Sequence, residues 1–372
     1  MGNPYKTPAK MISSDYTKQI SSAVKEANKI AAEAERKIEY HNGAVVINNG
    51  RLLNFLLENR STGKSYYWKR RAVKNFIEKG EMFMYIRRNK IDMDMSVPLF
   101  FDDIGHEFPN YTMETTGNTF ILVKKDGDEI VKKPCGYFFN LAAGGRIKSM
   151  PLETVTLIIF DEFIPEDGKY LRPYDFGYEP RTILSIILTV ARGYKKVIRD
   201  NVQCVCLANA VYEYNPYFAY FGIKLNKTGV FKNDKYYAHI KQNDSVAEAI
   251  KNSKVGSIIA DTSYGGYAIT NKPWSEHGHD IALPDKKAYP VFYLFVDEWY
   301  RCAVSGDSLY FSHGFDETFK RKYKCADTEM LDTPWFSGEP LKIAVSFYNK
   351  AKVFYDDQHT KAMISGILNH RR

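Results

Sequence analysis

The sequence predicts an α/β protein whose N-terminal part is built on a mostly parallel sheet. Three observations lead to this prediction. The apolar run RLLNFLLE (51–58) leads through a Gly-Lys-Ser turn into a segment (64–79) that contains neither glycine nor proline and ends before Gly80. This order of strand, tight loop and helix is typical of a βα unit. Two further apolar runs, 154–163 and 202–210, end in polar residues, as buried parallel strands do where they reach a ligand.

Length and composition indicate the setting. With 372 residues, 44% of them apolar, the chain can form about two domains with buried cores. Its five cysteines form no CxxC pair, which argues against a zinc site or a secreted disulfide scaffold and favours a reducing cytoplasm. The N-terminus is polar rather than leader-like, and the apolar run 182–191 is too short to span a bilayer, so no membrane partner is expected. The net charge of +8 suits a polyanionic partner but does not require one.

The turn between the first strand and its helix matches a phosphate-binding P-loop at all but one position. In the pattern Gly-x4-Gly-Lys-Ser/Thr, Gly63, Lys64 and Ser65 fit, whereas Glu58 replaces the first glycine. A helix that begins here points free N–H groups and its positive end at phosphates. Lys64 is therefore expected to reach the β- and γ-phosphates of ATP, and the Ser65 hydroxyl to coordinate Mg²⁺. A chance Gly-Lys-Ser is the alternative, and the flanking strand and helix argue against it.

The second and third strands supply the other half of this candidate site. Asp161 and Glu162 end the run at 154–163. Asp161 is placed to hold Mg²⁺ through water, and Glu162 to orient and polarise the attacking water. A strand that leads into an acidic surface turn is the alternative for this segment alone. Asn209 ends the third strand, at the position that senses the γ-phosphate in this class of ATPase.

Four segments occur in a specific order along the chain: NFLLENRSTGKSYYWK, FMYIRRNK, TLIIFDEFI and CVCLANAVYEYNPYFAYF. Together they resemble the DNA-packaging ATPases of phi29-like tailed phages, compact relatives of the terminase large subunits. The resemblance extends from about residue 40 to near the C-terminus and is strongest in residues 50–225. It implies a terminase-type P-loop, which lacks the first glycine and carries an arginine. The residues expected to bind ATP are Arg60, Ser61, Thr62, Gly63, Lys64 and Ser65.

The resemblance also implies a domain organisation. A helical extension (1–40) would precede an additional-strand (ASCE) P-loop ATPase domain (41–223), a linker (224–245) and a vestigial ribonuclease-H-like nuclease domain (246–372). The implied function is ATP-driven translocation of double-stranded DNA into a preformed capsid, in the host cytoplasm at the capsid portal. The implied assembly is a homo-oligomeric ring, expected to be a pentamer, and a structural packaging RNA is a further candidate partner.

In such rings a neighbouring subunit supplies a cation to each ATP site. The segment TVAR points to Arg192 as this arginine, with Arg199 as the alternative, and Lys148 matches a family lysine upstream of the second strand. A guanidinium on the γ-phosphate stabilises the charge that develops during hydrolysis. The alternative for each residue is a solvated surface cation.

Two basic segments are candidates for contact with nucleic acid. Residues 118–142 read as strand, Asp-Gly turn and strand. The lysines beside the turn either lie in solvent at a hairpin edge, where they discourage pairing with other chains, or touch DNA phosphates in the pore of the ring. The sequence leaves both interpretations open. A second cluster, FKRKYKC (319–325), favours contact with nucleic acid or the portal. The basic residues of the two segments are Lys124, Lys125, Lys132, Lys133, Lys320, Arg321, Lys322 and Lys324.

Nuclease activity is not expected. A two-metal nuclease needs several converging carboxylates, and the candidates Asp261, Asp297 and Glu298 show no spacing that marks a cluster. Another additional-strand ATPase, such as a helicase or a DNA-loading ATPase, is the rival functional class, although no helicase motifs are found. A non-enzymatic nucleotide-binding module is a third class, and the adjacent Asp161 and Glu162 argue against it.

Overall fold

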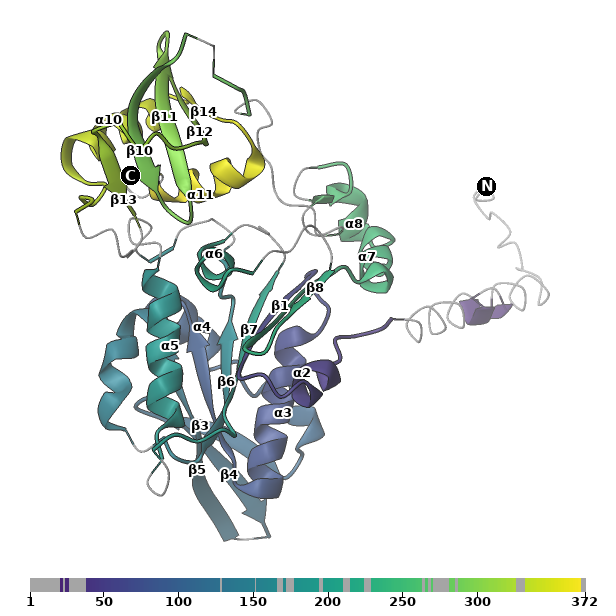
Figure 1. The fold of residues 1–372 in the computed structure, drawn as a ribbon. Coiled ribbons are helices and arrows are strands. Elements are labelled where there is room, and N and C mark those ends of the chain that lie inside the picture. Colours follow the sequence, from purple (N-terminus) through teal and green to yellow (C-terminus); the bar gives the residue numbers. More distant parts are fainter. Residues whose placement is uncertain are drawn as a thin grey trace, which may run out of the picture.

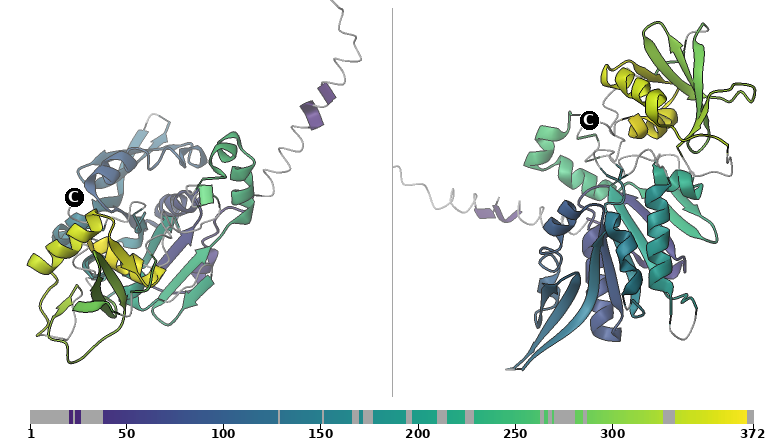
Figure 2. Two further views of the ribbon diagram at one scale, coloured as in Figure 1. Left: turned by 90° about the horizontal axis from the view of Figure 1, so that it is seen from above. Right: turned by 90° about the vertical axis from the view of Figure 1, so that its left-hand side faces the viewer.

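The computed structural model describes most of the chain between residues 38 and 368 (Figures 1 and 2). The predicted N-terminal helix lies largely outside the described part. The described residues are 21–22, 24–26, 38–127, 129–150, 152–165, 170–171, 177–193, 197–209, 215–223, 229–262, 265–266, 269, 281–284, 287–325 and 332–368.

A nine-stranded mixed sheet forms the larger domain. Its order is β3-β4-β5-β2-β6-β7-β1-β9-β8, and the six strands from β5 to β9 in this order run parallel to one another. Because β7 lies between β1 and β6, the sheet has the additional strand that the sequence predicted. The strands are β1 Leu53–Glu58, β2 Met82–Arg87, β3 Tyr111–Thr116, β4 Thr119–Asp126, β5 Glu129–Asn140, β6 Val155–Asp161, β7 Gln203–Asn209, β8 Gly229–Lys232 and β9 Tyr236–Lys241.

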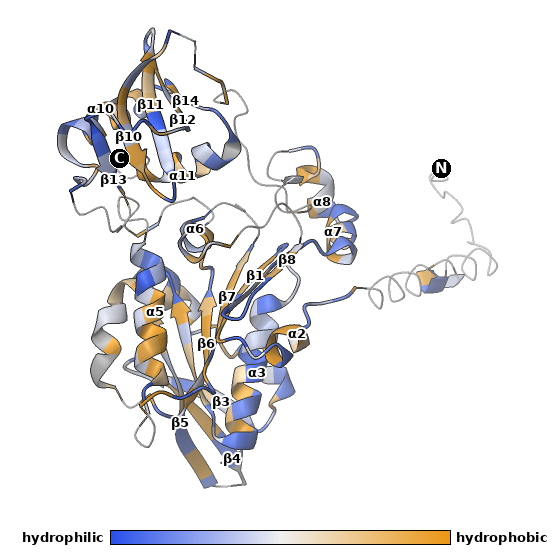
Figure 3. Ribbon diagram, in the orientation of Figure 1, coloured by the Kyte–Doolittle hydropathy of each residue, from blue (hydrophilic) through white to orange (hydrophobic). Residues whose placement is uncertain are grey.

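Helices cover both faces of this sheet. Alternate residues of β6 face opposite ways: Ile159 packs in one cluster with Trp68 of α3, and Ile158 packs in the other with Ile186 of α5. Both layers are apolar because a parallel strand is buried on both faces. Figure 3 shows the hydrophobic strands between partly hydrophilic helices. The helical elements of this domain are α2 Ala44–Asn48, α3 Lys64–Lys79, α4 Lys90–Ser96, η1 Gly105–Glu107, η2 Leu141–Ser149, α5 Tyr178–Ala191, α6 Pro216–Phe221, α7 Asp244–Lys251 and α8 Lys254–Ile259.

The predicted linker is wrong in part, because residues 229–241 complete the larger sheet. β9 pairs in parallel with β1, and β8 pairs antiparallel with β9. The abundance of Lys, Asn and Asp in this segment predicted a linker with one pairing strand. These polar residues instead occupy the turn and the exposed side of an edge hairpin, while Tyr237 and Ile240 are buried.

The C-terminal domain is a separate α/β unit with its own core. Its five-stranded sheet has the order β13-β10-β11-β12-β14, with β10 to β12 forming an antiparallel meander. The ribonuclease-H-like assignment of this domain stays a prediction. Figure 1 shows this domain beyond the end of the large sheet where α6 lies. Its elements are β10 Tyr289–Phe295, β11 Trp299–Ser305, β12 Ser308–His313, β13 Lys322–Lys324, α10 Gly338–Asn349, β14 Val353–Tyr355 and α11 Gln358–Leu368.

Candidate functional site: a nucleotide pocket at the carboxyl ends of the strands

A cavity opens where β1, β6 and β7 end. The register places Glu58 beside Asn209 and Asp161 beside Leu207, so the ends of the three strands are level. Most of the residues predicted to act on ATP therefore surround one space. The cavity is lined by Ser61, Thr62, Gly63, Lys64, Ser65, Tyr66, Asp161, Glu162, Ala208 and Asn209.

The loop before α3 has the backbone of a phosphate-binding turn. Ser61 and Gly63 have φ values of 62° and 81°, in the left-handed region that glycine adopts most readily. Gly63 is also the N-cap of α3, and its carbonyl accepts the N–H of Tyr67 at 2.9 Å. The helix thus begins at Lys64 and presents unpaired N–H groups to the cavity, as anion sites do.

Lys64 is buried and held by the loop itself. Its Nζ donates to the carbonyls of Glu58 at 3.1 Å and Asn59 at 2.7 Å, and to the Thr62 hydroxyl at 3.2 Å. Burial lowers the pKa of Lys64 to about 8, against the opposing attraction of Glu58 and Asp161. A phosphate would favour the charged ammonium, because it supplies the negative charge that a buried cation lacks.

Asp161 and Ser65 lie together, as a magnesium site requires. The Ser65 hydroxyl donates to Asp161 Oδ1 at 3.0 Å, and the Tyr85 hydroxyl donates to Oδ2 at 3.1 Å. Hydroxyl and carboxylate oxygens are ligands that Mg²⁺ accepts beside phosphate. The residues present therefore fit Mg²⁺ bound with a nucleotide.

Glu162 has an unusual backbone and a specific partner. Its φ is 58°, a conformation that costs roughly 1–2 kcal/mol for a residue with a side chain. Such outliers occur where function requires them. The Glu162 side chain is 48% exposed, and its Oε2 lies 2.7 Å from Arg87 Nη2.

Arg87 is a site residue that the sequence reasoning did not identify. It ends β2, the neighbour of β6, and its Nη1 also lies 3.3 Å from Asp161 Oδ2. One guanidinium thus pairs with both carboxylates of the site. Its position in FMYIRRNK gives a signal, because the carboxyl ends of adjacent parallel strands meet at one edge. The next residue, Arg88, is buried and bonds Glu179 of α5 and the carbonyl of Phe163.

Glu58, which replaces the first glycine of the P-loop, is buried between two histidines. It is 2% exposed, and its Oε1 lies 2.8 Å from His41 Nδ1 and 3.0 Å from His239 Nε2. Burial opposes ionisation, but the hydrogen bonds from His239 and His41 outweigh it and hold the pKa of Glu58 far below its usual range. Glu58 is the last residue of β1 and is not among the described residues with positive φ. No glycine is therefore needed at this position.

The three residues that are candidates for completing the ATP site of a neighbouring subunit differ in their environments. Arg192 is exposed at the C-terminal end of α5. Arg199 instead donates through Nη2 to the carbonyls of Val155 at 2.9 Å and Leu152 at 3.2 Å, which occupies it within its own subunit. Lys148 lies in η2, and its side chain is outside the described part of the structure.

The predicted hairpin is present as β4 and β5, and it carries its lysines away from the nucleotide pocket. Since β5 runs parallel to β2, its first residues lie at the opposite end of the sheet (Figure 1). Lys125, Lys132 and Lys133 are exposed and Lys124 is half-buried. Lys132 pairs with Glu114 at 2.7 Å.

The second basic cluster is only partly available at the surface. Lys320 and Arg321 are exposed, whereas Lys322 is half-buried. Lys324 is 8% exposed, and its Nζ lies 5.5 Å from the centre of the Trp335 ring. Lys324 therefore offers little exposed surface to a phosphate in this structure, and its contact with DNA stays a prediction.

Asp297 and Glu298 lie close to two histidines, although their positions in the sequence mark no cluster. Asp297 and Glu298 form the turn between β10 and β11 and lie against His313 and His359. These histidines come from distant parts of the chain, which is why no motif marks the group. Asp261, exposed in the turn after α8, is not part of it.

The fold and the pocket define a P-loop nucleotide-binding protein with an additional strand between β1 and β6. A family model for the podovirus DNA encapsidation protein (Gp16) matches residues 36–358. The chain belongs to this family, and the packaging of viral DNA is its function.

Individual relatives agree with this assignment. The DNA packaging protein of Bacillus phage B103 is 31% identical over 327 residues, which cover 86% of this chain and 91% of that protein. The DNA packaging protein of Bacillus phage phi29 is 31% identical over 235 residues, 63% of this chain and 65% of that protein. A chain of the bacteriophage phi29 viral genome packaging motor assembly superposes with a TM-score of 0.59 at 25% identity, covering 90% of this chain and 100% of that one.

Proposed function

We propose that the chain is an ATPase that drives double-stranded viral DNA into a preformed capsid. The observation that carries this proposal is the convergence of Lys64, Ser65, Asp161 and Glu162 on one cavity at the ends of parallel strands. Membership of the DNA encapsidation family supports the movement of DNA into the capsid as the process that ATP hydrolysis drives. No helix among the described residues is long and apolar enough to cross a membrane.

Each residue of the pocket has a proposed role. Lys64 and the N-terminus of α3 bind the β- and γ-phosphates, so the Lys64 ammonium exchanges loop carbonyls for phosphate oxygens. Ser65 and Asp161 hold Mg²⁺, which when bound neutralises charge on the phosphates. Glu162 orients the attacking water, and Asn209 at the end of β7 senses the γ-phosphate.

Arg87 restrains Glu162 in the structure described here. A carboxylate bound to a guanidinium at 2.7 Å has one oxygen occupied and is a weaker acceptor for a water proton. We infer that Arg87 must release Glu162 before hydrolysis, while its contact with Asp161 keeps the strand ends together. The pocket is thereby held inactive until it is rearranged by ATP, DNA or a neighbour.

The assembly is part of the same proposal. Several copies of the chain form a ring, which is a pentamer by analogy with the family. This ring docks at the capsid portal in the host cytoplasm, and a packaging RNA is a candidate partner. Exposed Arg192 completes the ATP site of a neighbour, and Lys148 assists it. Exposure of Arg192 and internal bonding of Arg199 support this choice.

The C-terminal domain is proposed to contact DNA or the portal without cutting DNA. Exposed Lys320 and Arg321 provide the charge for phosphate contact. Incubation of the protein with supercoiled plasmid and Mg²⁺ or Mn²⁺ tests this. We expect the plasmid to stay intact, and linearisation that is lost in Asp297→Ala would contradict it.

Hydrolysis of ATP with Mg²⁺ by the purified protein tests the proposed activity. Lys64→Ala should abolish both nucleotide binding and turnover. Lys74→Ala is the matched control, because Lys74 lies on the same helix with its side chain 51% exposed, and it should behave as wild type. Full turnover in Lys64→Ala would contradict the proposal.

A further inference from the structure

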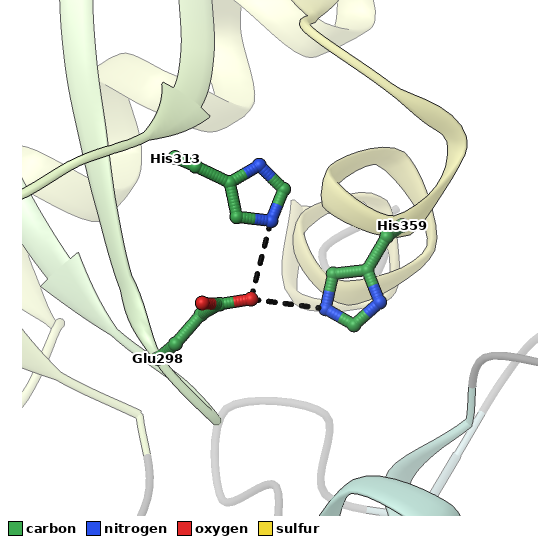
Figure 4. A group of neighbouring side chains, drawn as sticks. All are labelled: Glu298, His313 and His359. Carbon is green, nitrogen blue, oxygen red and sulfur yellow. Dashed lines mark ion pairs between the residues drawn. The ribbon is translucent and has the colours of Figure 1, made fainter. Parts of the chain in front are cut away.

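The C-terminal domain brings two histidines and a carboxylate to one point (Figure 4). Glu298 lies in the turn after β10, His313 is the last residue of β12, and His359 lies in the first turn of α11. Glu298 Oε1 is 3.1 Å from His313 Nε2 and 3.5 Å from His359 Nε2. The three ligand atoms lie within 4.8 Å of one another. Three separate elements thus contribute one donor atom each.

The spacing suits a metal ion. Zinc binds imidazole nitrogen and carboxylate oxygen at about 2.0–2.2 Å, so tetrahedral ligands lie about 3.3–3.6 Å apart. The two distances from Glu298 Oε1 are close to this separation. Asp297 lies beside this group and is not part of it: its Oδ2 is 3.0 Å from His359 Nε2, but the donor atoms that lie within 4.8 Å of one another are those of Glu298, His313 and His359. The other oxygen of Asp297 accepts the Tyr300 hydroxyl at 2.7 Å, which holds the carboxylate in place.

His313 is oriented from its far side. Its Nδ1 lies 3.0 Å from Asp356 Oδ2, and the same oxygen accepts the His313 backbone N–H at 2.7 Å. A carboxylate on the remote nitrogen leaves Nε2 directed at the other donors, which is the usual support of a metal-binding histidine. The contact of Asp357 with the same Nδ1 is longer, at 3.8 Å.

His41, beside Glu58, differs from His313: the nitrogen that it turns toward the carboxylate cannot bind a metal ion. His41 Nε2 accepts the indole N–H of Trp68 at 3.1 Å, so in the neutral ring Nδ1 carries the proton and donates to Glu58. That nitrogen has no lone pair for a metal. His313 has no such constraint on Nε2, because Asp356 accepts from its Nδ1.

We propose that His313, His359 and Glu298 bind a single divalent transition-metal ion of the zinc class, with water as the remaining ligand. Imidazole ligands favour such an ion over Mg²⁺, which prefers oxygen and water. The site is open to solvent, since the side chains of Glu298 and His313 are 52% and 35% exposed. It belongs to a different domain from the Mg²⁺ site at Asp161. The bound ion links the β10–β11 turn, β12 and α11, and so stabilises the domain proposed to contact DNA or the portal.

Metal titration of the full-length protein tests this proposal. The protein is stripped with EDTA, dialysed, and titrated with Zn²⁺ by calorimetry and with Co²⁺ by visible absorption. We expect one ion per chain, a cobalt spectrum of nitrogen and oxygen ligation, and a melting temperature that rises with Zn²⁺. Affinity should fall at least about tenfold in His313→Ala and in Glu298→Gln. His106→Ala, which removes an exposed histidine of the larger domain, should bind as wild type.

Each other result overturns the proposal. Absence of Zn²⁺ binding by the wild type, or equal affinity in Glu298→Gln, would remove the site. Equal affinity for Mg²⁺ and Zn²⁺ would contradict the metal class. Glu298→Gln keeps the test valid if His313→Ala fails to fold, because it changes an exposed turn residue without loss of packing.

Discussion

At the residue scale, the site depends on charged side chains that lie close together, with Asp161, Lys64 and Arg87 buried from solvent. Asp161 is 6% exposed, Lys64 is 7% exposed, and Arg87 pairs with both carboxylates at the end of β6. Few buried ionisable groups are tolerated without partners. The arrangement of Lys64, Asp161 and Glu162 was predicted from the motifs, whereas Arg87 was not, because pairing between β2 and β6 is a property of the folded sheet.

Glu162 should be essential for turnover but not for nucleotide binding. Glu162→Gln removes the negative charge that polarises water while it keeps the shape of the side chain. We expect ATP hydrolysis to slow by at least ~10²-fold with little change in the binding of a fluorescent ATP analogue. Glu78→Gln, on the exposed side of α3, is the control. Near-normal turnover in Glu162→Gln would remove this residue from its role.

Lys64 should make nucleotide binding depend on pH. The pKa of Lys64 in the free protein is lowered to about 8, and bound phosphates should raise it again because they favour the ammonium. Above pH 8, binding must therefore take up protons, and affinity should fall as pH rises. Calorimetry at pH 9 in two buffers of different ionisation enthalpy measures this uptake. Equal affinity at pH 7 and pH 9.5 without proton uptake would show that Lys64 is charged throughout.

At the element scale, α3 shows what the sequence could predict and β9 shows what it could not. The predicted helix of residues 64–79 is confirmed, because left-handed glycines stand at both ends and Gly80 N–H closes the last turn on Phe76. The strand β9 was predicted only as a pairing strand inside a linker. Its partner β1 lies far away in the chain, so no local pattern shows that it joins the main sheet or that His239 reaches Glu58.

Arg192, at the end of α5, should act on a neighbouring subunit. Arg192→Ala alone should be inactive, and so should Lys64→Ala alone. Mixed together they should regain ATP hydrolysis, because the first supplies an intact P-loop and the second an intact arginine. The activity of mixtures at several ratios measures this. If no ratio restores activity, Arg192 acts within its own subunit or only supports the fold.

At the scale of the whole molecule, the chain joins a P-loop domain to a C-terminal domain that has its own core. The mixed α/β fold with a large, mostly parallel sheet was predicted from three strand patterns and is confirmed. The assignment of the C-terminal domain rested on resemblance, because its histidines and acids come together only through tertiary folding. Exposed lysines on the β4–β5 hairpin and the exposed residues Lys320 and Arg321 lie on different domains, so DNA contact can involve both.

DNA binding should be independent of sequence and sensitive to salt. Lysines and arginines that neutralise phosphates release counterions, so six or more contacts would lower affinity by about 10³-fold or more between 50 and 200 mM salt. Fluorescence anisotropy with two unrelated duplexes of equal length measures both properties. Equal affinity across this salt range, or strong preference for one duplex, would contradict a translocase.

The central claim is that ATP turnover in the pocket between Lys64 and Glu162 drives DNA into a capsid. The direct measurement is packaging of DNA into purified, portal-bearing procapsids, followed by nuclease digestion of the DNA that remains outside. With ATP and Mg²⁺, the wild-type protein should protect the DNA, and Glu162→Gln should protect none despite binding ATP. Equal protection by Glu162→Gln, or by the wild type without ATP, would contradict the account.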